Sequence, residues 1–343
     1  MAARQCAAVS SDFTWLDGER LIRFGEGAAA DAPPLLEAHG FVGYALLTTD
    51  RAAGSAPDVL QAASAVIEVP PGRVDDISAG LLEAAEDRPL VALGGGRVVD
   101  TAKAIGGVRG GAPAAIPTTL SGAEMTPFHR TPRGVPGARM VRPALVVADP
   151  ALMASQAPPA LTASAMNALA HAMEALYTPL ANPVTELAAL RAADLIAAAV
   201  PRDPPGREEL SLGALLAGYA SGATGIAVHH AVSQTIVRTA GAPHAETNAV
   251  MLPHSARLMA GRAPGAMGAF AAALGDPEGD PAAAAGRAAT LAARAGHTRL
   301  SSLGVEETRL PDIAASAAKH PALANTPEPP GEEELTELLR EAL

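Results

Sequence analysis

Short apolar runs alternate with helical stretches along the first 150 residues. Strands are predicted for five such runs, at residues 44–49, 65–69, 89–93, 114–116 and 145–148. Helices are expected between them, for example at residues 74–86 and 98–105. Strands that are apolar throughout and separated by helices indicate a parallel sheet covered on both faces. Residues 1–150 are therefore predicted to form an α/β domain.

The pattern changes after residue 150, where long segments rich in alanine and leucine follow and strand-like runs almost vanish. Helices are predicted at residues 163–177, 184–200, 208–220, 227–239, 248–260 and 282–295. Residues 326–334 are predicted to be a surface connection before a last short helix. Residues 151–343 are therefore predicted to form a second domain that is all-helical.

Composition narrows the possible classes of protein. With 343 residues, 49% hydrophobic and 18% charged, the chain has enough apolar material for two cores. The formal net charge of -11 repels phosphates, so no nucleic acid or anionic membrane is expected as a partner. The single cysteine, Cys6, excludes an internal disulfide framework and fits a cytoplasmic protein.

Two segments resemble targeting or membrane sequences by length alone. Residues 1–21 carry acidic side chains and lack a long apolar run, so no signal peptide is expected. Residues 210–237 carry no Asp, Glu, Lys or Arg and are long enough to span a bilayer. Their serines, histidines and glycines favour a buried helix–loop–helix passage instead.

A glycine triplet follows the third predicted strand. Gly94, Gly95 and Gly96 lie where a buried strand ends and a helix should begin. Glycines allow a ligand to approach the backbone, and the helix N-terminus offers N–H groups to a pyrophosphate. Asp100 and Lys103 share a face of that helix, and Lys103 is one of only two lysines in the chain. The alternative is a tight turn with a solvated charge pair.

A second polar loop follows the fourth predicted strand. Its sequence, IPTTLSGAEMTP, places the hydroxyls of Thr118, Thr119 and Ser121 at a strand end, where open α/β sheets bind ligands. Hydroxyls there could hold a phosphate or a ribose. They could equally cap the next helix, since Ser and Thr are good N-caps.

Histidines gather in the middle of the helical part, where five of the nine lie between residues 171 and 254. Asn167 and His171 are four residues apart, as are His230 and Gln234, so each pair shares a helix face. His244 follows in a Pro-His-Ala-Glu segment. Three histidines that converge could bind a transition metal, whereas isolated ones would be hydrogen-bonded core residues. Spacing alone leaves both interpretations open.

Taken together, these segments resemble the iron-containing (group III) alcohol dehydrogenase family, and within it the maleylacetate reductase branch. The matching segments are residues 23–27 (RFGEG), 94–103 (GGGRVVDTAK), 116–124 (IPTTLSGAE), 149–150 (DP) with 164–177 (SAMNALAHAMEALY), and 229–254. The resemblance implies a Rossmann-like N-terminal domain and a helical C-terminal domain, the dehydroquinate synthase-like architecture. It further implies an active site in the cleft between them and a homodimer.

The resemblance also assigns a nicotinamide cofactor to the first domain. The residues it implies for cofactor binding are Asp50, Gly94, Gly95, Gly96, Asp100, Lys103, Thr118, Thr119 and Ser121. Asp50, at the end of the first predicted strand, would lie near the adenosine ribose. A carboxylate there accepts hydrogen bonds from a 2′-hydroxyl and repels a 2′-phosphate, which favours NADH over NADPH.

In the metal-dependent members, positions matching Asn167, His171, His230 and His244 hold the metal. Those members have Asp where this chain has Asn167, and a neutral amide is the poorer ligand. Maleylacetate reductases also have Asn there and work without metal. The resemblance therefore implies a metal-free site with Asn167, His171, His230 and His244 as catalytic residues. Iron or zinc at the three histidines is the alternative.

The predicted function is a metal-independent reductase that transfers hydride from NADH to an enone or carbonyl carbon of a small molecule. Arg238 or Arg257 would bind a substrate carboxylate. Departures from the family pattern at Arg97, Gln234, Arg238 and Asn248 leave a second function open. It is a lyase, dehydratase or cyclase that uses the histidines for acid–base chemistry without a redox cofactor. A non-catalytic binding or scaffold subunit is the third.

Overall fold

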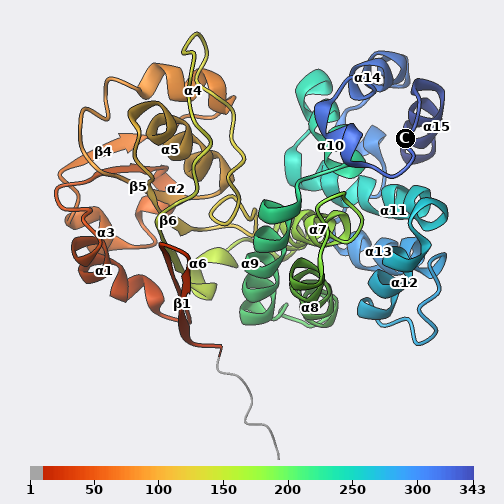
Figure 1. Cartoon of the computed structure of the whole chain (residues 1–343), viewed down its shortest axis with the longest axis horizontal. Coiled ribbons are helices and arrows are strands. Elements are labelled where there is room, and N and C mark those ends of the chain that lie inside the picture. Colours follow the sequence, from red (N-terminus) through yellow and green to blue (C-terminus); the bar gives the residue numbers. More distant parts are fainter. Residues whose placement is uncertain (1–10) are drawn as a thin grey trace, which may run out of the picture.

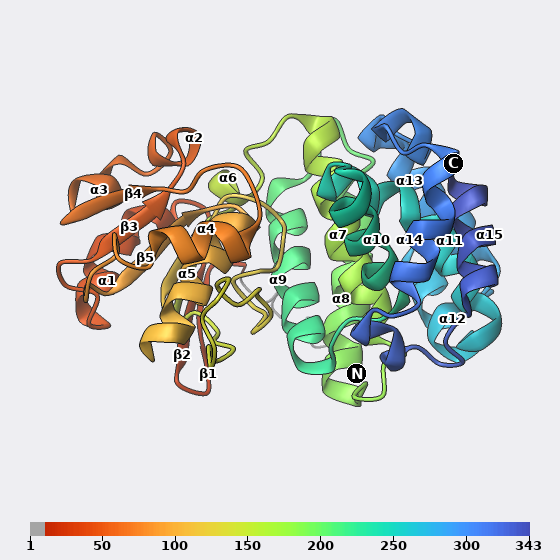
Figure 2. The same cartoon turned by 90° about the horizontal axis from the view of Figure 1, so that it is seen from above.

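The computed structural model describes residues 11–343, and Cys6 lies outside them. Figure 1 shows two parts side by side, an α/β part in red to yellow and a helical part in green to blue. Helix α9 (Arg207–Thr224) is the helix of the second part that lies nearest the first in both views (Figures 1 and 2). The predicted division at residue 150 stays a prediction, although the last strand ends at Ala148.

Within residues 11–343, all strands belong to one sheet of the α/β part, in the order β1-β2-β7-β6-β5-β3-β4. They are β1 (Phe13–Asp17), β2 (Arg20–Phe24), β3 (Ala45–Thr48), β4 (Ala65–Glu68), β5 (Leu90–Gly94), β6 (Ala114–Pro117) and β7 (Leu145–Ala148). β1 and β2 form an antiparallel hairpin, and every other pairing is parallel. The five predicted strands and the parallel sheet are thus confirmed.

The sheet is buried because its central strands are apolar on both faces. Leu46, Val91 and Ile116 point to one face, where they pack under α1 (Ala32–Ala38) and α3 (Pro57–Gln61). Alternate residues such as Leu47 and Ala92 point to the other face, under α4 (Val74–Leu81) and α5 (Gly96–Arg109). Full burial of one such aliphatic side chain is worth about 1.5–3 kcal/mol.

Short elements complete the α/β part. They are η1 (Ala28–Asp31), α2 (Asp50–Ala53) and α6 (Pro150–Met153). The helix predicted at residues 74–86 ends early, at Leu81, and Glu86 adopts a positive φ of 43° that no helix accommodates. The β1–β2 hairpin was not predicted. Its residues alternate between partly buried and exposed in β1, so no continuous apolar run marks it.

The helical part is built around α7 (Pro158–Ala175), whose residues from Leu161 onward are all buried. It packs against α8 (Pro183–Ala199), α9 and α11 (His244–Arg262). The remaining helices are α10 (Val228–Ala240), α12 (Pro264–Ala273), α13 (Ala283–Ala292), α14 (Leu310–Ala317) and α15 (Glu332–Ala342). Four 3-10 turns connect them: η2 (Ala293–Ala295), η3 (Leu300–Leu303), η4 (Glu307–Arg309) and η5 (Pro321–Asn325). The predicted helices are confirmed.

The uncharged segment at residues 210–237 forms most of α9 and α10, with a bend at Gly225 between them. Among the described residues, no helix by itself has the length and apolarity to cross a bilayer. The α9–α10 pair reaches both thresholds jointly, but its two helices are bent by 100°. Both helices are largely buried in this structure, as predicted for a helix–loop–helix passage.

Candidate active site

The glycine triplet lies where β5 meets α5, beside the loop that follows β6. The Thr118 N–H donates to the Gly94 carbonyl at 3.0 Å, which ties the two strand ends together. A Cβ on Gly95 would lie 3.0 Å from Thr119 Cγ2, and one on Gly96 3.0 Å from Ser121 Cβ. The glycines therefore allow the two loops to pack closely against each other.

This strand edge has the groups that a pyrophosphate needs. Gly95 is the N-cap residue of α5, and no side chain caps the helix there. The N-terminus of an uncapped helix attracts anions through its N–H groups and its dipole. The hydroxyl of Thr118 is buried without a hydrogen-bond partner. An unpaired buried hydroxyl is costly unless a ligand or water satisfies it, so these residues fit a dinucleotide cofactor.

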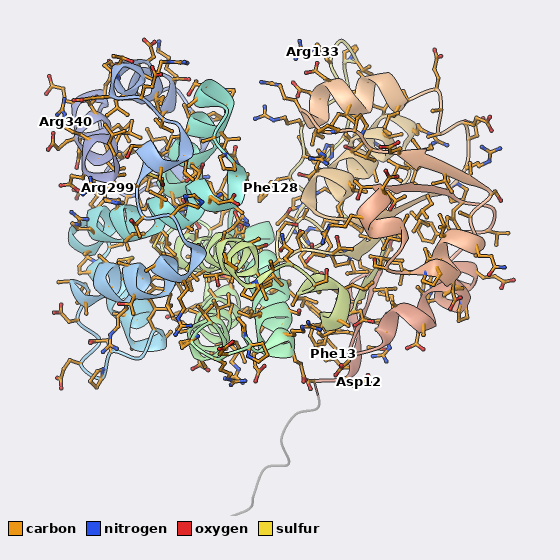
Figure 3. The ribbon with its side chains drawn as sticks, turned by 180° about the vertical axis from the view of Figure 1, so that it is seen from behind. Asp12, Phe13, Phe128, Arg133, Arg299 and Arg340 are labelled. Carbon is orange, nitrogen blue, oxygen red and sulfur yellow. The ribbon has the colours of Figure 1, made fainter. Side chains whose placement is uncertain are left out.

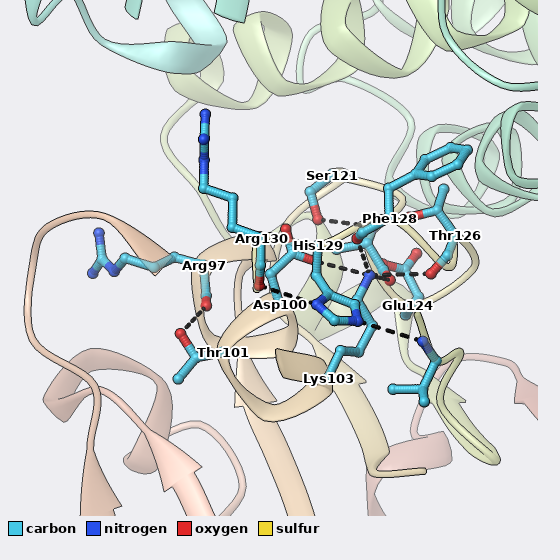
Figure 4. A network of polar contacts seen from close by, with 12 residues as sticks. Arg97, Asp100, Thr101, Lys103, Ser121, Glu124, Thr126, Phe128, His129 and Arg130 are labelled. Carbon is cyan, nitrogen blue, oxygen red and sulfur yellow. Dashed lines mark hydrogen bonds and ion pairs between the residues drawn. The ribbon is translucent and has the colours of Figure 1, made fainter. Parts of the chain in front are cut away.

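Lys103 shapes the loop at residues 118–128 instead of facing solvent. Its fully buried ammonium donates to the carbonyls of Ala123 at 2.8 Å, Thr126 at 3.0 Å and Phe128 at 2.7 Å. It also lies 2.7 Å from Asp100 Oδ1 (Figure 4). An ammonium has three N–H donors, so none is left for a phosphate. A cofactor contact stays a prediction for Asp100. Lys103 would affect the cofactor only by holding the loop at residues 118–128 in place.

The same loop buries an acidic side chain that was not predicted. Glu124 is fully buried, and neither of its carboxyl oxygens has a hydrogen-bond partner. Burial raises the pKa of this carboxyl to about 7, against the opposing charges of Lys103 and Arg20. Arg20 binds the main-chain carbonyl of Glu124 at 2.9 Å and not the carboxylate.

Asp50 lies at the same edge of the sheet as the glycine triplet. It is exposed and begins α2 directly after β3, which neighbours β5 in the sheet. The carboxyl ends of parallel neighbours meet at one edge, so the position suits a ribose contact. That contact stays a prediction.

Two of the predicted histidines meet in the helical part. The rings of His171 on α7 and His230 on α10 stack with centroids 4.1 Å apart and planes inclined by 18°. His171 Nδ1 lies 3.1 Å from the Ser221 hydroxyl on α9. His230 Nε2 is buried and has no hydrogen-bond partner.

A glutamate behind His230 was missed from the sequence. Glu174 is fully buried on α7, and its Oε2 lies 2.6 Å from His230 Nδ1. Its Oε1 accepts the backbone N–H of His230 at 3.2 Å. Burial raises the pKa of Glu174, whereas the N–H groups of Ala227 and His230 are among the influences that lower it. The available signal was an acidic residue in an apolar helix, three positions after His171.

Asn167 connects α7 to the loop of the α/β part. Its Nδ2 donates to the Ser121 carbonyl at 3.5 Å, and its Oδ1 is buried without a partner. A Cβ on Gly122 would lie 3.9 Å from His171 Cδ2, so this loop also adjoins the histidine. Figure 3 shows Phe128 of the loop between the two parts. We call this region, where residues 118–130 face the helical part, the junction.

Two further histidines of this segment, His229 and His244, have different surroundings. His229 lies in the core, with Nδ1 3.1 Å from the Ser255 hydroxyl and Nε2 2.9 Å from Asn248 Oδ1. Burial lowers the pKa of His229 to about 3, so it is a neutral structural residue. His244 begins α11 and is exposed, and Asn248 Nδ2 donates to its carbonyl at 2.7 Å.

The donor set does not fit a divalent metal. A metal–imidazole bond lies in the ring plane, and the nearly parallel, stacked rings of His171 and His230 do not aim two lone pairs at one point. Asn167 offers an amide oxygen in place of a carboxylate. Within the part of the chain that the structure describes, no three His, Cys, Asp or Glu side chains are grouped to hold a metal.

The glycine-rich edge of a parallel sheet, the polar loop beside it and a buried histidine–glutamate pair in a helical part together suit a two-part enzyme of the dehydrogenase class. The Fe-containing alcohol dehydrogenase family, C-terminal, matches residues 161–343. Maleylacetate reductase 1 of Rhodococcus opacus is 37% identical over 261 residues, 73% of this chain and 72% of that protein. The chain therefore belongs to the Fe-containing alcohol dehydrogenase family and is an oxidoreductase, as the sequence motifs indicated.

Solved structures agree with this assignment. The crystal structure of maleylacetate reductase from Agrobacterium tumefaciens matches with a TM-score of 0.83 at 30% identity, over 96% of this chain and 97% of that one. Sulfoacetaldehyde reductase from Bifidobacterium kashiwanohense in complex with NAD+ matches with a TM-score of 0.79 at 25% identity, over 94% and 96%. The predicted Rossmann-like and helical architecture is thereby confirmed.

Proposed function

We propose that this protein is a metal-independent, NADH-dependent reductase that transfers a hydride to the carbonyl or enone carbon of a small carboxylated substrate. The single observation that carries the proposal is His230 Nε2. It is a buried, unpartnered imidazole nitrogen. Its ring stacks on His171, and His171 adjoins Gly122 of the loop that follows β6. A reductase needs such an atom to supply a proton to the substrate.

The cofactor would lie along the sheet edge. The N–H groups at the start of α5 would hold its pyrophosphate, and the hydroxyls of Thr118, Thr119 and Ser121 would contact the rest. Asp50 would accept hydrogen bonds from the adenosine ribose, which disfavours a 2′-phosphate and NADPH. When bound, NADH supplies two electrons and one proton as a hydride from its nicotinamide ring.

Glu174 and His230 would deliver the second proton. Because burial raises the pKa of Glu174 and lowers that of His230 to about 3, a protonated Glu174 can donate to Nδ1 of a neutral ring. The imidazole proton then resides on Nε2 and donates to the acceptor oxygen. As the carbon gains the hydride, the oxygen takes the Nε2 proton and Nδ1 takes the Glu174 proton. Solvent then returns one proton to Nε2, and the Nδ1 proton moves back to Glu174, which restores the starting state.

Asn167 and His171 would orient the acceptor. The Asn167 Oδ1 and Nδ2 atoms lie next to the Ser121 loop, and His171 stacks on His230 from the side of α7. No step of this mechanism requires a metal, in keeping with the donor set described above. His244, exposed at the start of α11, would line the substrate path.

A titration of chelator-treated protein with NADH and NADPH tests the proposal. We expect NADH to bind more tightly than NADPH without metal, and to be oxidised in the presence of carbonyl or enone carboxylates. His230→Ala and His244→Ala should each lower turnover far more than they lower thermal stability. If the folded protein binds neither nucleotide, the proposal is wrong and the lyase, dehydratase or cyclase alternative takes its place.

We also propose a cytoplasmic homodimer. A groove of about 780 Å³ lies between the β1 strand and helices α8 and α9, and its lining is mostly apolar. Its lining includes Phe13, Trp15, Val184 and Leu187, and the last two are 61% and 72% exposed. β1 is an edge strand of the sheet, so a second copy could cover both the edge and the groove.

A further inference from the structure

His171 is held by a serine that the proposed mechanism does not use. His171 Nδ1 lies 3.1 Å from the Ser221 hydroxyl on α9, and Ser221 is fully buried. Within residues 11–343 this contact is the only hydrogen bond of either side chain. α7 and α9 pack against each other, so the contact joins two helices of the core. The pairing therefore accounts for one ring nitrogen of His171 and leaves Nε2 for a ligand.

Two glycines allow the Ser221 face of α9 to pack directly on the loop that follows β6. A Cβ on Gly218 would lie 3.0 Å from Gly122 Cα, and one on Gly222 would lie 3.0 Å from the Met125 carbonyl oxygen. Side chains at these two positions would push the loop away from α9. Ser221 comes three residues after Gly218, so both lie on the same side of the helix.

The other side of the His171 ring is turned to this loop. A Cβ on Gly122 would lie 3.9 Å from His171 Cδ2. Nδ1 and Cδ2 are the two ring atoms bonded to Cγ, and Nε2 is bonded to Cδ2. The Nδ1 edge therefore meets Ser221, while the edge that carries Nε2 meets the loop. Because His230 stacks on the same ring, His171 Nε2 lies on the junction side, next to the proposed proton donor.

The donors and acceptors at this contact determine which nitrogen of His171 carries the hydrogen. Burial lowers the pKa of His171 well below its ordinary value, so the ring is neutral near pH 7 and has one N–H. If Nδ1 carried the hydrogen, the Ser221 oxygen would accept it, and the hydroxyl would have no acceptor among the described residues. If Nδ1 is unprotonated, the hydroxyl donates to it and both groups are satisfied. The buried pair therefore favours hydrogen on Nε2.

Thr224, three residues further along α9, shows an alternative that Ser221 does not adopt. The Thr224 hydroxyl donates to the Ala220 carbonyl, four residues back, at 2.9 Å. Ser and Thr side chains within helices can bond to their own helix in this way. In the part of the chain that the structure describes, Ser221 makes no such bond, so its hydroxyl hydrogen is available to His171.

We propose that Ser221 is a positioning residue, which holds the His171 ring between α9 and the loop with the ring hydrogen on Nε2. His171 then presents a fixed N–H donor to the substrate. A serine hydroxyl, unlike the Glu174 carboxyl, supplies no proton to the ring near neutral pH. The two stacked rings therefore have different roles, since His230 delivers a proton and His171 donates a hydrogen bond. The inference rests on the proposed function, because it assigns how a residue of that same site is oriented.

Nitrogen NMR of protein that contains ¹⁵N-labelled histidine measures the tautomer directly. The His171 signals are those that disappear in His171→Gln. In wild type without substrate or cofactor, we expect an unprotonated Nδ1 and a protonated Nε2. Ser221→Ala should move the Nδ1 resonance toward that of an unprotonated nitrogen without a hydrogen bond. Ser211→Ala is the matched control, because Ser211 is a fully buried serine on the same helix whose hydroxyl has no partner within residues 11–343.

Steady-state kinetics tests the role of Ser221 in turnover. We expect kcat of Ser221→Ala to fall about tenfold with KM changed little, which is less than the roughly 10²–10³-fold cost of deleting an oxyanion donor. Ser211→Ala should keep kcat within about twofold of wild type.

A protonated Nδ1 in wild type would overturn the inference, and that spectrum decides by itself if Ser221→Ala does not fold. An Nδ1 resonance that Ser221→Ala leaves unchanged, or wild-type kcat in this variant, would equally overturn it. Absence of reductase turnover in wild type would count against the proposed function instead. The NMR signals would still decide whether Ser221 sets the tautomer of His171.

Discussion

Glu174 lies behind His230, and in the proposed mechanism it determines which nitrogen of the imidazole carries a proton. Glu174→Gln keeps a donor to Nδ1 but cannot release a proton to it. We expect kcat to fall roughly 10²–10⁴-fold with KM changed little, because general acid catalysis contributes about that much. Steady-state kinetics with NADH in excess would measure this.

Glu186→Gln is the control for that variant, because Glu186 is exposed and lies on another helix, α8. Circular dichroism should show both variants folded. Wild-type kcat in Glu174→Gln would exclude the proton relay and leave Glu174 a structural role.

A second buried carboxyl predicts how stability depends on pH. Burial raises the pKa of Glu124 from its ordinary value of 4.5 to about 7, so the folded state binds more protons than the unfolded state between these values. The contribution of Glu124 to stability is therefore complete below about pH 4.5 and is lost as pH rises through 7. Glu124→Gln removes this loss.

We expect the stability of Glu124→Gln relative to wild type to increase between pH 5 and pH 8, by up to about 3 kcal/mol. Urea unfolding at the two pH values measures the difference. Glu83→Gln, at an exposed carboxyl, should show no such change. An equal difference at both pH values for Glu124→Gln would show that its carboxyl titrates normally.

At the scale of elements, the Lys103 side chain fixes the conformation of the loop that follows β6. Lys103 on α5 donates to three carbonyls of the loop at residues 118–128. Lys103→Met keeps the apolar stem but leaves those carbonyls unpaired, at about 1–3 kcal/mol for each buried group that stays unsatisfied. We expect faster hydrogen exchange in residues 118–128 and weaker NADH binding. Lys319→Met, at the other lysine, is exposed and should change neither.

Helix and strand positions were largely predictable because burial leaves a pattern in the sequence. The central strands are apolar at every position, and α7 is apolar over several turns. The β1–β2 hairpin left no such pattern, since Phe13 and Trp15 alternate with exposed residues. The helix at residues 74–86 was predicted too long because nothing in its composition marks the end at Leu81.

Residues of the candidate site could be predicted only where they fall in family motifs. Asn167, His171 and His230 were identified by resemblance, and α7 and α10 bring the two histidines together. Glu174 and the role of Lys103 were missed, because each depends on a partner more than 15 residues away that only the fold supplies. Arg257, a candidate for the substrate carboxylate, is instead paired with Glu341 at 2.8 Å.

At the scale of the whole molecule, the apolar groove beside β1 predicts the assembly. We expect wild type to elute as a dimer, about twice the 34.4 kDa of one chain, when measured by light scattering coupled to gel filtration. Leu187→Asp puts a charge on a side chain that is 72% exposed on the groove, and should shift the protein toward monomer. Met140→Asp alters a side chain that is 55% exposed in a loop outside the groove. It should leave the dimer intact, because a charge there meets only solvent. A monomeric wild type would contradict the dimer. Equal dissociation by both substitutions would show that the groove is not the dimer contact.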